Sequence, residues 1–159
     1  EQYRLFGGDR PDSRNVKNPG ANLKWDYTTW DSQMKFKNLE KLGWQPDWSR
    51  KVPLLVRAMV SDGDLMFVAG PPNVAQPAGH MGDARLRLEN PQEALAAWKG
   101  RKGALLFAVS CKSGKILQKM RLKSLPAFDG MAAAQGRLYL STKDGRVLCF
   151  DAGEASGSD

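Results

Sequence analysis

The sequence predicts an all-β fold in which about two antiparallel units stack against one another. Segment Met59–Val68 matches Ala132–Ser141 in pattern, because each has an apolar run, a turn containing glycine and a second, alternating apolar run. A third short apolar strand follows each segment, at Leu106–Ser110 and at Val147–Asp151. One such unit cannot cover its own apolar face, so its repetition predicts a stacked or radial β architecture.

Glycine and aspartate mark the predicted bends between strands. Asp-Gly between apolar runs is a strong hairpin signal, because both residues adopt the backbone conformation of a tight turn. We expect the first hairpin to join Leu54–Val60 to Leu65–Ala69, and a later strand over Ile116–Leu122 to alternate apolar and charged residues. The residues expected to act as structural turns, rather than as metal ligands or catalytic acids, are Asp62, Gly63, Gly114, Gly136, Asp144 and Gly145.

Residues 1–52 are predicted to form an irregular N-terminal arm that packs on the sheets. Disordered segments are poor in aromatic residues. This polar stretch instead contains four of the five tryptophans of the chain, Trp25, Trp30, Trp44 and Trp48. Tryptophan covers apolar surface while its indole N–H finds an acceptor at the rim, so packing explains these residues. The alternative is that their exposed faces bind a carbohydrate or protein partner.

An insertion of about thirty residues, at 71–102, interrupts the repeat in a loop between strands, where such architectures accept additions. Its second half is predicted to form one short helix. Asn90 suits the N-cap, Pro91 the first helical position and Glu93 the third, while Gly100 ends the run.

The net charge is +7 over 159 residues, which raises the question of nucleic-acid binding. The cations are interspersed with acids, as where Lys35, Lys37 and Lys41 lie near Asp31 and Glu40. This mixture predicts a solvated surface rather than a phosphate-binding patch. No run approaches the roughly 18 apolar residues of a transmembrane helix, so no membrane span is expected.

Few side chains suggest chemistry. His80, the single histidine, lies in a loop without an accompanying nucleophile motif, and is kept only as a candidate contact for a ligand or partner. Cys111 and Cys149 lack a metal-binding spacing, and whether they form a disulfide stays open. If Arg57 on the first strand is buried it needs an acidic partner, for which Asp129 is the candidate.

Two segments resemble a known repeat. Leu106–Lys115, with its Ser-Gly-Lys turn, and Gly136–Asp151, with its Asp-Gly turn, resemble the repeat of bacterial pyrroloquinoline-quinone-type propellers, the quinoprotein-dehydrogenase-like family. The resemblance extends over residues 54–70 and 104–151. It implies a partial β-propeller of about two antiparallel blades within 53–159, forming the C-terminal part of a longer periplasmic or secreted protein.

The resemblance supports the fold more than the catalysis. Ser110 stands where the repeat has the aspartate that Asp151 supplies in the second copy, and the adjacent cysteine pair and calcium ligands of quinone-dependent dehydrogenases are not found. We therefore predict a non-catalytic binding or scaffolding role without a cofactor. The alternative is the C-terminal part of a dehydrogenase that binds pyrroloquinoline quinone with calcium in blades absent from this chain. The remaining propeller blades, or another chain, are the expected partners.

Overall fold

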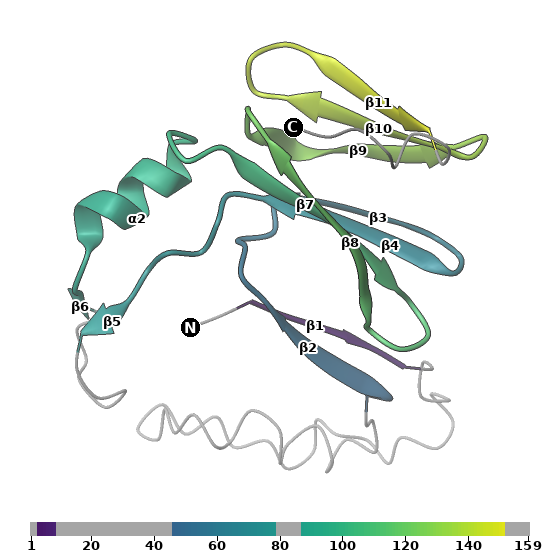
Figure 1. Ribbon diagram of the computed structural model, residues 1–159, viewed down its shortest axis with the longest axis horizontal. Coiled ribbons are helices and arrows are strands. Elements are labelled where there is room, and N and C mark those ends of the chain that lie inside the picture. Colours follow the sequence, from purple (N-terminus) through teal and green to yellow (C-terminus); the bar gives the residue numbers. More distant parts are fainter. Residues whose placement is uncertain (1–2, 9–45, 79–86, 152–159) are drawn as a thin grey trace, which may run out of the picture.

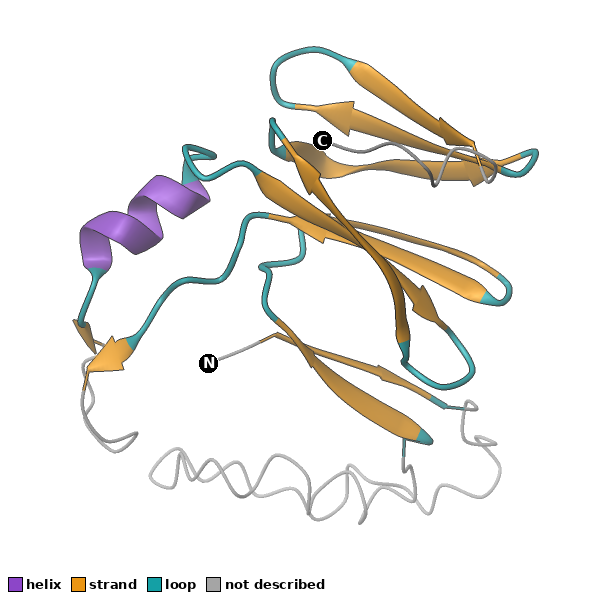
Figure 2. Ribbon diagram, viewed as in Figure 1, coloured by secondary structure: helices purple, strands orange, loops and turns teal. Residues whose placement is uncertain are grey.

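The computed structural model describes residues 3–8, 46–78 and 87–151, which form mainly antiparallel β-strands and one short helix (Figures 1 and 2). This mostly-β content is what the sequence predicts. Three sheets lie in layers: a two-stranded sheet, a four-stranded sheet and a three-stranded sheet (Figure 1). The tryptophans Trp25, Trp30 and Trp44, and His80, lie outside the described residues.

The middle layer is a four-stranded sheet in the order β3-β4-β7-β8. Its strands are β3 (Ala58–Asp62), β4 (Leu65–Gly70), β7 (Ala104–Ser110) and β8 (Ile116–Leu122). A strand covered on both faces is apolar throughout rather than alternating. β7 follows this rule, because Leu106 faces one buried cluster whereas Phe107 and Val109 face another.

The third layer repeats the first three strands of the middle layer. It comprises β9 (Pro126–Ala134), β10 (Arg137–Thr142) and β11 (Val147–Asp151), in the order β11-β10-β9. The turns of the two leading hairpins contain Gly63 and Gly136, whose φ angles are 56° and 73°. Both glycines adopt the left-handed conformation that their turns require. The predicted equivalence of these two hairpins is confirmed.

The first layer was not expected from the sequence. β1 (Tyr3–Gly7) and β2 (Trp48–Val52) pair antiparallel across a long separation in the chain. The prediction of an irregular arm is therefore wrong for these two segments. Leu5 is the only buried residue of β1 and Val52 the only one of β2, so neither strand carries the alternating pattern by which a strand is recognised.

Two buried clusters hold the layers together. One, between the middle and third layers, contains Ala58, Ala69, Ala104, Leu106, Leu122, Leu125, Leu138 and Leu140. The other, between the middle and first layers, contains Leu5, Val52, Leu54, Val68, Phe107 and Val109. Each layer thus covers an apolar face of its neighbour, as expected for repeated units that cannot fold alone.

The first strand of the middle layer begins later than predicted, at Ala58 rather than at Leu54. Leu54 forms only an isolated bridge with Pro72, although Leu55 N–H still donates to the Pro71 carbonyl at 2.9 Å. Proline has no backbone N–H to donate to a neighbouring strand. Pro71 and Pro72, which lie opposite this segment, therefore end the regular pairing here.

The insertion contains β5 (Pro77–Ala78), β6 (Arg87–Leu88) and α2 (Pro91–Trp98), which confirms the predicted helix. The predicted capping by Asn90 is wrong in one respect, because its side chain makes no capping bond to the helix. The Asn90 amide instead accepts from Gln76 N–H at 3.0 Å and donates to the Val74 carbonyl at 2.8 Å. It therefore ties the start of the helix to the preceding loop.

Candidate functional site

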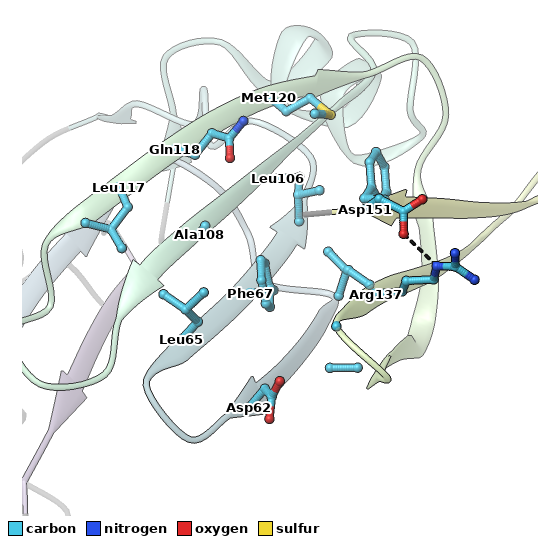
Figure 3. A pocket seen from close by; sticks show the side chains of 14 residues that line it. Asp62, Leu65, Phe67, Leu106, Ala108, Leu117, Gln118, Met120, Arg137 and Asp151 are labelled. Atoms are coloured by element: carbon cyan, nitrogen blue, oxygen red, sulfur yellow. Dashed lines mark hydrogen bonds and ion pairs between the residues drawn. The ribbon is translucent and has the colours of Figure 1, made fainter. Parts of the chain in front are cut away.

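A groove lies between the middle and third layers, with a volume of about 640 Å³ (Figure 3). Apolar side chains from both sheets line it, some buried and others half-buried or exposed. The middle sheet contributes Phe67 from β4, Ala108 from β7 and Met120 from β8, and the third sheet contributes Leu138 and Phe150. The groove is therefore a largely apolar space, and the small residue Ala108 lies on the wall that the middle sheet forms.

The connection between the two sheets is clamped to the third sheet at the end opposite the groove. The β10–β11 turn docks on the chain segment between β8 and β9, where Lys143 N–H donates to the Leu125 carbonyl at 2.8 Å. The groove instead borders Gly136 and Arg137 at the start of β10. The layers are thus closed around Leu125 and open around Gly136.

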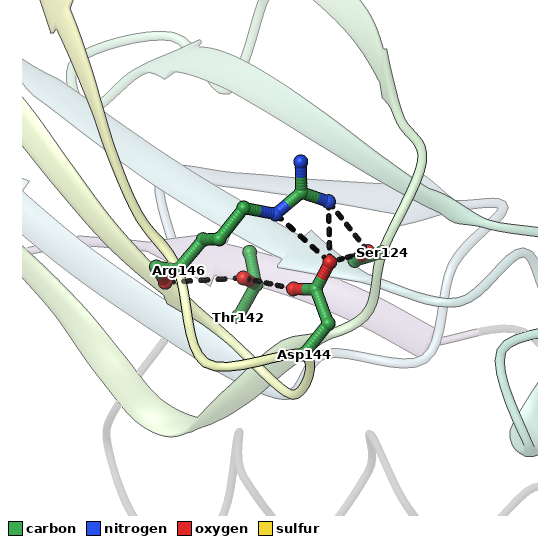
Figure 4. A network of polar contacts seen from close by, with 4 residues as sticks. All are labelled: Ser124, Thr142, Asp144 and Arg146. Atoms are coloured by element: carbon green, nitrogen blue, oxygen red, sulfur yellow. Dashed lines mark hydrogen bonds and ion pairs between the residues drawn. The ribbon is translucent and has the colours of Figure 1, made fainter.

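A network around Asp144 makes this clamp (Figure 4). The Ser124 hydroxyl donates to the Asp144 carboxylate at 2.7 Å and Arg146 Nε donates to the same oxygen at 2.9 Å. The buried Thr142 hydroxyl lies within hydrogen-bonding distance of both the carboxylate and the Arg146 carbonyl. Hydrogen bonds from Thr142, Arg146 and Ser124 hold the pKa of Asp144 far below its usual value. Asp144 forms the predicted turn with Gly145, whose φ is 81°, and in addition ties that turn to Ser124.

An ion pair borders the open end of the groove. Arg137 Nε donates to Asp151 Oδ1 at 2.6 Å, across the register that pairs these two residues of β10 and β11 (Figure 3). This hydrogen bond raises the pKa of Arg137. Both side chains are about half exposed, at 51% and 45%, so the pair adds little to stability and serves mainly to neutralise charge beside an apolar space.

Trp48 is the one member of the predicted aromatic surface within the described residues. Its indole N–H donates to the Cys111 carbonyl at 2.6 Å, and its ring lies against the backbones of Gly7 and Gly114. A Cβ at Gly114 would come within 2.2 Å of this ring. Gly114, whose φ is 65°, therefore serves both as the predicted turn and as the space for Trp48.

Arg57 does not meet the acid that the sequence suggested. No ion pair joins it to Asp129 in the described part of the chain; the contact between them is a backbone bond from Asp129 N–H to the Arg57 carbonyl, at 3.0 Å. The guanidinium instead lies 5.5 Å from the centroid of the Trp98 ring, on α2. Its Nε is buried without a hydrogen-bond partner among the described residues. A cation over an aromatic face replaces the expected ion pair.

The remaining candidates do not form a reactive centre within the described residues. Cys111 and Cys149 are both free thiols, and burial raises the pKa of the Cys111 thiol. Asp62 is exposed at the end of β3 and borders the groove. Among residues 3–8, 46–78 and 87–151, no group of three histidine, cysteine or acidic side chains is placed to hold a metal ion, and no helix is long and apolar enough to cross a membrane.

The groove was missed at the level of sequence, although two signals for it exist there. Leu117 and Met120 are apolar residues on the last strand of the middle sheet, and the second repeat has no apolar run after Asp151. Together they indicate an outer strand whose face no described strand between Pro126 and Asp151 covers. A scan against protein-family models and searches of curated proteins and of solved structures give no significant match to this chain.

Proposed function

We propose that this chain is a non-catalytic binding or scaffolding segment of a β-propeller-type bacterial protein that acts in the periplasm or outside the cell. The observation that carries the proposal is the stacking of repeated antiparallel sheets face to face, with apolar clusters on both faces of the middle sheet. Successive blades of a propeller pack in this way. The resemblance of Leu106–Lys115 and Gly136–Asp151 to the quinoprotein propeller repeat supports the bacterial and extracytoplasmic setting.

In this role the sheets form a rigid frame and the partner binds at its open surfaces. The ligand classes that suit such surfaces are proteins and carbohydrates, because the groove offers apolar side chains beside a neutralised ion pair. Function on repeat folds resides in sites at loops and edges rather than in the frame itself. The frame therefore needs no cofactor of its own.

Ligand-induced stabilisation separates this proposal from the dehydrogenase alternative. A ligand that binds the folded state raises its melting temperature by mass action. Because the alternative places the cofactor in blades outside this chain, the test is made on the whole protein of which this chain would be a segment. We expect pyrroloquinoline quinone added to it with calcium to leave both the melting temperature and the absorbance of the cofactor unchanged. A saturable shift in both would overturn the proposal in favour of the dehydrogenase.

A second measurement tests the frame itself. If the layers form one rigid unit, the slowest amides of all three sheets should exchange with solvent at similar rates, because they open only together. Buried Val52, Val68 and Leu140 represent the first, middle and third layers. Exchange of Leu140 at a rate far above that of Val68 would show that the third layer opens independently and is not part of a rigid scaffold.

A further inference from the structure

Among the described residues, the third layer has no counterpart of β8, the strand that completes the middle layer. In the middle sheet β7 lies between β4 and β8, whereas β10 is the one described strand that pairs with its counterpart β11. The edge strands β3 and β9 of the two sheets lie beside each other. Counted from these strands, β4 corresponds to β10 and β7 corresponds to β11. A strand added next to β11 would therefore take the place in the third sheet that β8 has in the middle sheet.

The outer edge of β11, which no described strand pairs with, carries backbone groups that do not bond to β10. Thr142 N–H donates to the Arg146 carbonyl at 2.8 Å, which makes these two residues a hydrogen-bonded pair. Bonded and non-bonded pairs alternate along an antiparallel ladder, so in β11 Leu148 and Phe150 bond to β10. The residues whose N–H and C=O groups point away from β10 are Val147, Cys149 and Asp151.

This edge lacks the features that protect other sheet edges. Proteins discourage unwanted pairing with charged residues, proline and irregular backbone. β8 carries Lys119 and Arg121, and β9 begins at Pro126 and contains Asp129 with a φ of 51°. β11 reads Val-Leu-Cys-Phe-Asp, and its only charge, Asp151, is already paired with Arg137. The edge is therefore open to pairing.

The groove lies where an added strand would place its side chains. Phe150 and Asp151 of β11 border it on one side, and Leu117, Gln118 and Met120 of β8 on the other (Figure 3). The first layer covers the apolar residues on the opposite face of this sheet, whereas Leu117 beside the groove is 53% exposed. A small apolar ligand would fill the groove but would leave the outward N–H and C=O groups of β11 without hydrogen-bond partners. An added strand would fill the groove and also bond to those groups.

We propose that β11 and the groove beside it bind an extended strand of another polypeptide, antiparallel to β11. Alternate side chains of that strand are apolar and enter the groove between Phe150 and Met120, while its backbone pairs with Val147, Cys149 and Asp151. When a peptide adds to a sheet edge, hydrogen bonds between the two backbones give affinity, and pockets that accept alternate side chains give specificity. The inference rests on the proposed scaffolding function and specifies its partner.

A synthetic peptide that alternates valine with threonine and lysine is the probe. Added to the full chain, it should slow amide exchange at Val147, Cys149 and Asp151 by about tenfold or more at saturation, because their N–H groups become bonded. Leu148 and Phe150 already bond to β10 and should change much less. A peptide of the same composition, with its valines placed consecutively, is the control and should give no protection.

Two variants separate the edge from the groove. Cys149→Pro removes an outward N–H without removing a bond to β10, a substitution that an edge strand tolerates, and should weaken peptide binding about tenfold or more. Its matched control, Cys149→Val, keeps the N–H and should bind as the wild type does. Ala108→Phe fills the groove and should also weaken binding, with the β11 edge intact.

The outcomes are decisive for the inference. Retained cooperative unfolding in each variant shows that the fold is intact; a Cys149→Pro chain that fails to fold is replaced by Ala108→Phe as the test. Equal binding by all variants, protection at the β8 edge instead, or pairing of β11 with a second copy of this chain without peptide binding would overturn it. These results leave the quinone and frame tests untouched, so the proposed scaffold can survive failure of the strand site.

Discussion

Gly70 offers the sharpest test of how the first and middle layers join. A Cβ added at this residue would lie 1.8 Å from the Leu55 carbonyl oxygen and 2.8 Å from the carbonyl carbon. Both are backbone atoms, so no side-chain rotation relieves the overlap. Gly70→Ala must therefore push the end of β4 away from the segment that leads into β3.

The cost follows from what this separation breaks. Leu55 N–H donates to Pro71 and Arg57 N–H to Ala69, each at 2.9 Å, and losing both bonds costs about 2 kcal/mol. Forcing extra volume into the packed region around Leu54 adds about 2 kcal/mol. The loss of backbone freedom in the unfolded chain offsets less than about 1 kcal/mol. We expect a net loss of about 3 kcal/mol in the free energy of unfolding.

Urea unfolding followed by tryptophan fluorescence measures this loss, with Gly136→Ala as the matched control. A Cβ at Gly136 meets no atom within 4 Å, and only its φ of 73° resists alanine, which costs about 1 kcal/mol. The two variants should therefore differ by about 2 kcal/mol, with Gly70→Ala the less stable. Equal losses, or a Gly70→Ala loss below about 0.5 kcal/mol, would refute the close approach of β4 to Leu55.

Three further predictions concern single side chains. Trp48→Phe removes the hydrogen bond to the Cys111 carbonyl and part of the ring that lies between Gly7 and Gly114. It should lower the free energy of unfolding, measured by urea titration, by about 2 kcal/mol. No loss would show that Trp48 does not anchor the first layer. Because the folded pKa of Asp144 is depressed, its stabilising contribution is present above its unfolded pKa of about 3.8 and is lost as pH falls below it. Asp144→Asn should therefore lose less stability than the wild type between about pH 6 and about pH 2, and an unchanged pH profile would contradict the clamp. Arg57→Met removes the unpartnered Nε and the cation over Trp98. It should raise the melting temperature slightly, because a buried unsatisfied donor costs about 1–3 kcal/mol, more than a cation–π contact of about 1 kcal/mol returns. A fall would show that the contact with Trp98 outweighs the unsatisfied donor.

Local patterns in the sequence predicted much of the middle and third layers. Asp-Gly turns and alternating apolar runs are local signals, and they place the hairpins around Gly63 and Gly136 correctly. The strands of the first layer were not predicted, because β1 and β2 pair residues that are remote in sequence, such as Tyr3 and Val52. The role of Asn90 was predicted only in part, because its amide bonds across the loop to Val74 and makes no capping bond to the backbone of its own helix.

The sequence by itself determined which segments form strands in the repeated units, because turn chemistry and side-chain alternation act within a few residues. Only the tertiary structure decided which surfaces stay open. The groove beside Phe150 lies between a sheet with an outer strand and a neighbour that has no such strand among the described residues, and the hydrogen bonds of Asp144 lie at the opposite end. Such features depend on the order and spacing of layers, which no local pattern specifies.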